Sequence, residues 1–222
     1  MWVTLLVVIS LLHLGSQLAA PGHMVSDVTQ VLLMPMLGGL VLASTRSPRS
    51  TIVVLTLVAV FFSWLGDSLP RMLDGDASFL TMVGCFLVAQ VSYVVLLCRW
   101  WRYSVIRHPV WLAPYLVVLG ILVVLCAPSA GVLLVPVVVY GLALVLMAVL
   151  STGMGLRGGL GGGIFFVSDS LIAVRSFTDL DLVAQDFWIM LTYILGQYLL
   201  VTAILDKGRV AVQAAGPHLT ER

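Results

Sequence analysis

Two aspartates lie inside long apolar stretches of this sequence, each in a similar local setting. Asp67 ends the segment FFSWLGD, and Asp169 ends the segment FFVSD. Placing a charged side chain at the centre of a lipid bilayer costs roughly 2.5–3.5 kcal/mol on insertion scales. Two such residues therefore indicate substrate chemistry, ion passage or a buried structural ion pair.

The composition is that of a membrane protein. Apolar residues make up 61% of the 222 residues and charged residues 9%, against about 25% charged residues in soluble domains. Spanning elements must satisfy their own backbone hydrogen bonds. Continuous Leu, Val and Ile runs favour helices over the alternating strands of a barrel. We therefore predict an all-α, polytopic integral membrane protein with one domain, residues 1–205, and a short cytoplasmic tail, residues 206–222.

Charged or Pro/Gly-rich breaks divide the sequence into eight hydrophobic runs. Runs of about 20 residues are long enough to cross a bilayer as helices. The eight predicted transmembrane helices are Trp2–Ala20, Thr29–Ala43, Thr51–Leu69, Phe79–Cys98, Val110–Cys126, Val132–Leu150, Leu160–Arg175 and Asp186–Leu205. The first could instead be a cleaved signal peptide. Because it lacks a basic start and a good cleavage site, we expect an uncleaved helix.

The basic residues predict the orientation. Nine of the eleven Lys and Arg residues fall on the side of the membrane that holds both termini, and Arg71 and Arg175 fall opposite. The nine are Arg46, Arg49, Arg99, Arg102, Arg107, Arg157, Lys207, Arg209 and Arg222. Because cytoplasmic connections concentrate Lys and Arg, we expect a multi-pass protein of the cell (plasma) membrane with both termini in the cytoplasm.

The two aspartate segments also indicate an internal repeat. They lie 102 residues apart, on the third and seventh predicted helices, and each precedes a helix that carries Gln and Tyr side chains. Two four-helix halves of the same orientation would form a 4+4 parallel pseudo-repeat, as in some transporters.

Further polar side chains fall at depths from which they could reach the aspartates. We take Gln30, Gln90, Tyr93, Ser168, Tyr193 and Gln197 as candidate substrate-binding residues. Alternatively, such groups only hydrogen-bond neighbouring helices, at about 0.6 kcal/mol each, and we favour this for His13, Gln17 and Tyr198. We expect both carboxyl groups to meet in one partly dry cavity that opens towards the outer side.

Other motifs are discounted. Gly153–Gly158 matches G-x-G-x-x-G, but a dinucleotide site needs a strand before it. We interpret the run of glycines through Gly163 as a tight turn and a close helix contact. One histidine, His13, lies inside a predicted helix, and the three cysteines are typical of packing residues. We therefore expect no metal site, no cofactor and no nucleic-acid partner.

Several of these segments together resemble the YhhN-like family of lysoplasmalogenases. The resemblance is carried by Gly66-Asp67, by Phe86 with Gln90-x-x-Tyr93, by FFVSDSLIA over residues 165–173, by LLMP over residues 32–35, and by Tyr193 with Gln197. It implies an eight-helix membrane enzyme that hydrolyses the vinyl-ether bond of a lysophospholipid substrate, the lysoplasmalogen, to a fatty aldehyde and a glycerophospho-alcohol. The family commonly has Lys where Gln30 stands and His where Gln90 stands.

Vinyl-ether hydrolysis begins with proton addition to the β-carbon, which gives an oxygen-stabilised cation that water captures. The proton donor must keep its proton near neutral pH, and removal from water favours the neutral form of a carboxyl group. We expect Asp169, the deeper residue, to be this acid; the sequence also allows the two aspartates to exchange roles. Asp67 would stay ionised, stabilise the cation and orient water, by analogy with glycosidase carboxylates.

Two other functions fit the same residues. Intramembrane acids and parallel repeats also suit a proton-coupled small-solute or lipid transporter. In a structural membrane protein, the two aspartates would merely pair with Arg71 and Arg175.

Overall fold

The computed structural model describes residues 1–19, 24–47 and 49–215, and within them it contains helices and no strands. The α-helices are α1 (Trp2–Ala19), α2 (Met24–Ser44), α3 (Thr51–Ser68), α4 (Gly75–Leu97), α5 (Pro109–Ala130), α6 (Leu134–Ser151), α7 (Leu156–Phe177) and α8 (Gln185–Ala215). Short 3-10 turns join several of them, among them η1 (Leu69–Met72) after α3.

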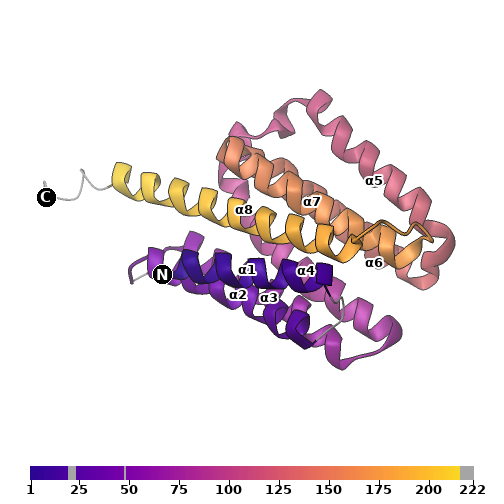
Figure 1. Ribbon diagram of the computed structural model, residues 1–222. Helices are drawn as coiled ribbons and strands as arrows, with labels where there is room; N and C mark the ends of the chain where they lie inside the picture. Colours follow the sequence, from indigo (N-terminus) through magenta and orange to yellow (C-terminus); the bar gives the residue numbers. More distant parts are fainter. Residues whose placement is uncertain (20–23, 48, 216–222) are drawn as a thin grey trace, which may run out of the picture.

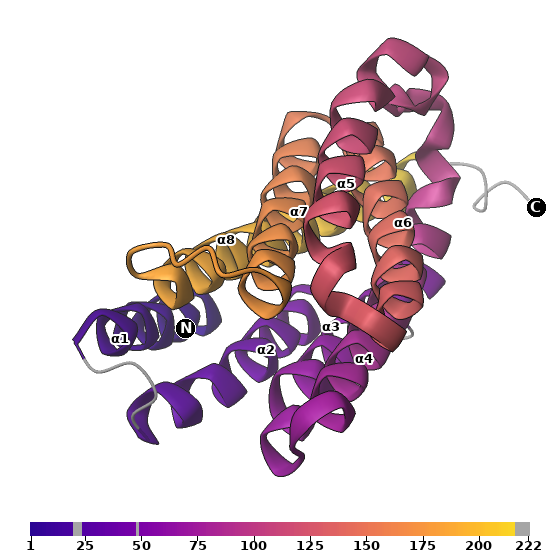
Figure 2. The same ribbon diagram turned by 90° about the vertical axis from the view of Figure 1, so that its right-hand side faces the viewer.

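Seven helical stretches in the described residues are long and apolar enough to cross a membrane. One of them, Val110–Met154, contains both α5 and α6. The chain reverses between these two helices at the turn Gly131–Leu133, so α5 and α6 run side by side in opposite directions (Figure 2). Counted separately, they give the eight predicted helices, and the predicted polytopic all-α fold is confirmed.

The helices form two groups in chain order, α1–α4 and α5–α8 (Figure 1). In each group the third and fourth helices make the most extensive contact, and the groups meet where α4 packs on α6 and where α8 contacts α1, α2 and α3. The start of α1 and the end of α8 lie at the same end of the bundle (Figure 1). We call the opposite end, which carries Arg71 and Arg175, the distal end.

Helices α2, α7 and α8 extend beyond their predicted boundaries. Helix α2 begins at Met24, so Gln30 lies inside the helix instead of at its start. Helix α7 begins at Leu156 and includes the glycine-rich segment, and α8 continues to Ala215. Gly disfavours helix by about 1 kcal/mol per residue relative to Ala, and in α7 the close contact with α8 outweighs that preference.

The glycines of α7 allow this close contact. A Cβ atom on Gly161 would lie 2.5 Å from the backbone nitrogen of Leu200, and one on Gly196 would lie 2.8 Å from the backbone nitrogen of Phe165. The preceding Gly155 makes the turn into α7 with φ 85°. The interpretation of this segment as a turn and a helix contact is confirmed. The contact fixes α7, which carries Asp169, against α8, which carries Tyr193.

The close contact makes a stability prediction with a matched control. Gly161→Ala should lower the free energy of unfolding by about 1–3 kcal/mol, because its methyl group meets the α8 backbone and the helices must separate. Gly163→Ala, on the same helix with nothing within 4 Å of the new Cβ, should instead stabilise by up to about 1 kcal/mol. Thermal unfolding of the purified variants in one detergent measures both. Equal shifts for the two variants would contradict the packing assignment.

Candidate functional site

Asp67 lies near the end of α3 at the boundary between the two groups of helices. Its side chain is buried, with the residue 8% exposed. The carboxylate accepts hydrogen bonds from the hydroxyl of Tyr193 at 2.8 Å and from Nε2 of Gln30 at 3.4 Å. Donors on α8 and α2 thus hold a carboxylate on α3, and the two predicted polar residues Gln30 and Tyr193 do meet Asp67.

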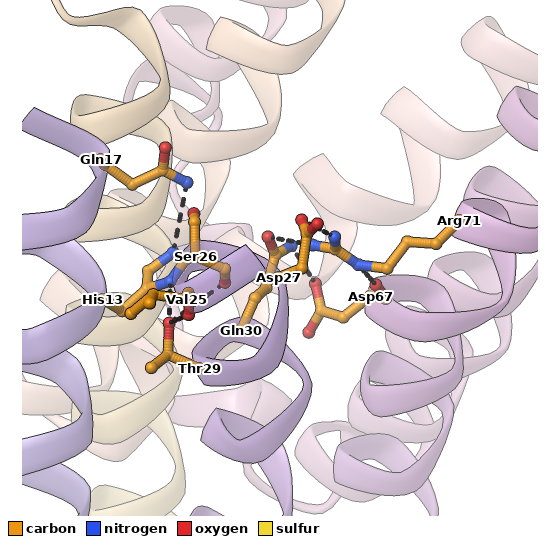
Figure 3. Close-up of polar contacts among 9 residues, drawn as sticks. All are labelled: His13, Gln17, Val25, Ser26, Asp27, Thr29, Gln30, Asp67 and Arg71. Atoms are coloured by element: carbon orange, nitrogen blue, oxygen red, sulfur yellow. Dashed lines mark hydrogen bonds and ion pairs between the residues drawn. The ribbon is translucent and has the colours of Figure 1, made fainter. Parts of the chain in front are cut away.

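Arg71 connects this carboxylate to the distal surface (Figure 3). It follows Asp67 by one turn in η1, and its Nε donates to the backbone oxygen of Asp67 at 3.0 Å. Its other nitrogens donate to Oε1 of Gln30 at 2.6 Å and to the carboxylate of Asp27. Gln30 is therefore held at both ends, because its oxygen accepts from Arg71 while its nitrogen donates to Asp67.

Asp169 lies on α7 and is buried to the same degree as Asp67, with 8% exposed. Its Oδ2 accepts a hydrogen bond from the hydroxyl of Tyr140 on α6. Gln90, which is 0% exposed, lies beside the Tyr140 hydroxyl, yet neither of its amide atoms makes a hydrogen bond of normal length and angle. An unpaired buried amide is costly, so Gln90 is a polar group in need of a ligand or a water.

A second layer of predicted residues lies further from the distal end. The hydroxyl of Tyr93 on α4 donates to Oε1 of Gln197 on α8 at 2.8 Å, and Nε2 of Gln197 donates to the hydroxyl of Ser63 on α3 at 3.1 Å. All three are fully buried. Within the described chain they line neither of the two cavities beside the aspartates. The layer joins α3, α4 and α8 directly beneath Asp67 and Tyr193.

Two adjoining cavities reach the aspartates. The polar cavity has a volume of about 320 Å³ and reaches Asp67. Its polar lining residues are Gln17, Gln30, Asp67, Ser168, Arg175, Ser176, Asp186 and Tyr193. The apolar cavity has a volume of about 40 Å³ and reaches Asp169 and Tyr140 between α4, α6 and α7. Met82, Phe86 and Ile172 line both.

The prediction that both carboxyl groups share one cavity is therefore wrong, because each lines a different cavity. Asp169 lines one cavity and Asp67 lines the other, and the apolar side chains of Met82, Phe86 and Ile172 line both. The carboxyl groups remain close enough for their charges to interact. Asp67 thus faces a polar space towards the distal end, and Asp169 faces an apolar one.

The remaining predicted residues are placed as follows. Ser168 lines the polar cavity, but its hydroxyl donates to the backbone oxygen of Ile189 at 3.0 Å, which ties α7 to α8. His13 is buried and lies 2.9 Å from the hydroxyl of Thr29, a contact between α1 and α2 as favoured from the sequence (Figure 3). Gln17 also lines the polar cavity, so its position is not explained by helix packing alone.

Sequence reasoning missed Tyr140. It is the one hydroxyl-bearing side chain between Leu134 and Leu150, and a phenol at membrane depth needs a hydrogen-bond partner. This requirement could have identified Tyr140 as a candidate site residue from the sequence. The structure supplies the partner, Asp169.

The structural reading of the two aspartates as ion-pair partners of the distal arginines is wrong. Arg71 pairs with Asp27, and Arg175 pairs with Asp186. All four of these side chains are partly exposed at the distal end. In the described residues, the carboxylates of Asp67 and Asp169 accept hydrogen bonds from neutral donors.

The fold and the site together define a polytopic helical membrane protein with two buried carboxyl groups, each held by a tyrosine from a neighbouring helix. The sequence model of the YhhN family matches residues 25–204, so the chain belongs to the YhhN family. The match covers α2 through most of α8, including both aspartates, and leaves out α1. No curated protein and no solved structure gave a significant match.

Proposed function

We propose that this YhhN-family protein is a lysoplasmalogenase-like hydrolase of the cell membrane, with both termini in the cytoplasm. It would convert a lysoplasmalogen and water to a fatty aldehyde and a glycerophospho-alcohol. The observation that carries the proposal is the placement of two buried carboxyl groups on adjoining polar and apolar cavities. A vinyl ether places a hydrocarbon chain on one side of the reacting bond and a polar glycerol on the other.

Asp169 is the proposed general acid. Its cavity is apolar, and removal from water favours the neutral form of a carboxyl group. Because Tyr140 binds Oδ2, the proton would reside on Oδ1 and pass to the β-carbon of the vinyl ether. The ether oxygen then shares the positive charge, and Asp169 is left ionised.

Asp67 is the proposed base. Donors from Gln30 and Tyr193 stabilise its ionised form, and the Arg71 guanidinium binds its backbone oxygen. The carboxylate would stabilise the cation and accept a proton from the attacking water, which gives a hemiacetal. Collapse of the hemiacetal breaks the bond to the glycerol oxygen: Asp67 would return its proton to the leaving alcohol, and the hemiacetal hydroxyl would give its proton to Asp169, so both carboxyl groups regain their starting states.

The other residues have supporting parts in this proposal. Arg71 holds Gln30 and the end of α3 in place, and Ser168 fixes α7 to α8. Tyr93 and Gln197 were expected to bind the lipid directly. In the proposal they instead fix α4 and α8 beneath Tyr193. Gln90, which is buried beside Tyr140 and lines neither cavity, would help to position the Tyr140 hydroxyl.

Tyr140 is a positioning residue for Asp169, and its removal has a defined expected effect. Tyr140→Phe should lower kcat by about tenfold to a hundredfold with little change in KM, because the Tyr140 hydroxyl would bind the Asp169 carboxylate that forms as the proton leaves, and a hydrogen bond to a charged group contributes about 1.5–3 kcal/mol. Tyr198→Phe, on α8 and outside both cavities, should stay within about twofold of wild type. Steady-state kinetics of aldehyde release measure both. A change in KM alone would contradict this role of Tyr140.

The test of the proposed function is a substrate panel. Purified protein is incubated with a lysoplasmalogen, with the matched lyso-ester, and with the matched saturated alkyl lysolipid, and products are identified by mass spectrometry. Aldehyde from the vinyl ether alone is the expected result, because only that bond is activated by protonation of carbon. Fatty acid from the ester, or no product together with pH-gradient-driven solute uptake into proteoliposomes, would overturn the proposal; the uptake result would support the transporter.

A further inference from the structure

The connection between α4 and α5 is a folded segment at the end of the bundle opposite the distal end. Helix α4 starts after η1 at the distal end and crosses the bundle to Leu97. The 3-10 turns η2 (Cys98–Tyr103) and η3 (Val105–Arg107) follow, and α5 begins at Pro109. We call residues 98–108 the proximal segment. Because α4 belongs to a stretch that is long and apolar enough to span a membrane, the segment lies where the hydrocarbon layer ends.

The proximal segment is anchored to the turn η5 (Thr152–Met154), which precedes α7. The backbone nitrogen of Val105 donates a hydrogen bond to the hydroxyl of Thr152 at 2.9 Å. A Cβ atom on Gly153 would lie 2.6 Å from the backbone oxygen of Trp100, so the close approach requires a glycine there. The segment is therefore held in a fixed position against the start of α7.

The outer face of the proximal segment combines guanidinium groups with aromatic rings. Its three arginines are exposed, and with the carboxylates of the described residues they form no ion pair: Arg99, Arg102 and Arg107. No Asp or Glu occurs in the sequence between Asp76 and Asp169. Trp101 and Tyr103 are 46% and 79% exposed. The Cζ atom of Arg102 lies 5.6 Å from the centroid of the Trp101 ring, which is a cation–π contact.

A basic surface of this kind can bind the phosphate of a lipid or a phosphate in solution. Guanidinium groups bind phosphate oxygens through two parallel hydrogen bonds. Trp and Tyr side chains lie preferentially at the level of the lipid head groups. Because the exposed rings of Trp101 and Tyr103 stand beside the arginines, a lipid phosphate fits this surface better than a phosphate in solution.

We propose that the proximal segment is a binding surface for anionic phospholipids of the leaflet on the side of both termini. The three arginines bind the lipid phosphates, and Trp101 and Tyr103 lie among the glycerol and ester groups of the same lipids. Bound lipid holds the segment, and through η5 the start of α7, in place. The inference does not depend on the hydrolase function, because these side chains line neither cavity beside the aspartates.

Two triple variants that remove equal charge from the same side of the membrane test the surface. One replaces the three arginines of the proximal segment by Gln. The control replaces three exposed basic residues of other connections by Gln, namely Arg46, Arg49 and Lys207. Each protein is reconstituted in phosphatidylcholine nanodiscs that contain a phosphatidylglycerol with a photoactivatable head group. The yield of label on each peptide is then measured by mass spectrometry after photolysis.

The wild-type protein should be labelled in the peptide that carries the proximal segment. Each basic residue near a membrane surface contributes about fivefold to anionic-lipid binding, so the first variant should lose at least about fivefold of this label and the control less than about twofold. Replacement of the same three arginines by Lys, which keeps the charge, should retain most of the label and shows that the Gln variant did not lose it by misfolding. An equal loss in both Gln variants, or equal labelling by a photoactivatable phosphatidylcholine, would overturn the proposal. Displacement of the label by soluble glycerol phosphate would overturn the assignment to a lipid.

Discussion

Asp169→Asn is expected to lower kcat for vinyl-ether hydrolysis by about 10²–10⁴-fold, the range that a general acid contributes. The amide has nearly the shape of the carboxyl group and can still contact Tyr140 on α6, so the geometry of α6 and α7 should persist. It has no acidic proton to give to carbon. Aldehyde release from purified, detergent-solubilised variants, measured under single-turnover conditions, reports the chemical step.

The control for this variant is an aspartate far from both cavities. Asp206 on α8 pairs with Arg157 at 2.6 Å, and both side chains are more than half exposed. Asp206→Asn should stay within about twofold of wild type, because exposed ion pairs contribute little. Aldehyde release by Asp169→Asn at the wild-type rate would remove Asp169 from the chemistry.

Asp67→Asn is expected to lower kcat by about 10²–10³-fold, the cost of removing one electrostatic group that faces developing charge. The Asn side chain keeps one acceptor oxygen, so it can still accept from Tyr193 or from Gln30, which bind different oxygens of the carboxylate. It cannot carry the negative charge that would stabilise the cation, nor accept a proton from water. Single-turnover aldehyde release measures the loss, and Asp76→Asn, on an exposed residue in the first turn of α4, is the matched control.

Stability separates catalytic from structural roles for the two aspartates. Both Asn variants should unfold close to the wild-type temperature, because the amide has nearly the shape of the carboxyl group and keeps one acceptor oxygen. If the two aspartates had only a structural role, the Asn variants would unfold at a lower temperature than the wild type. Their activity per folded molecule would be unchanged. Thermal unfolding, monitored by size-exclusion chromatography, and kinetics on the same samples decide between the catalytic and the structural role.

The sequence was sufficient for the helices because membrane crossing imposes a strong local constraint. Every described span needs an apolar run, and the breaks between runs carry charges, Pro or Gly. The boundaries of α2, α7 and α8 were less predictable. In α7 the glycine-rich segment is helical because α8 packs against it at Gly161 and Gly196, a tertiary effect that local composition does not contain.

For the site, too, the local sequence predicted some features and tertiary packing determined the others. Both aspartates were predictable because an acid in an apolar run is conspicuous, and Tyr193 and Gln30 do contact Asp67. Which polar groups form hydrogen bonds depends on how each helix is rotated about its axis. The sequence predicts the depth of a residue in the membrane, but not this rotation. Tyr93 and Gln197 therefore bond to each other, and Tyr140 takes the place beside Asp169. The division into two cavities depends on the side-chain packing of Met82, Phe86 and Ile172.

The position of a solvent deuteron in the product tests the two-aspartate mechanism most directly. Wild-type protein turning over a lysoplasmalogen in heavy water should release an aldehyde with one deuterium on the carbon next to the carbonyl, delivered by Asp169. Authentic aldehyde kept in the same buffer controls for exchange. Enzyme-formed aldehyde without deuterium at that carbon, or deuterated aldehyde formed by Asp169→Asn as fast as by wild type, would contradict the mechanism.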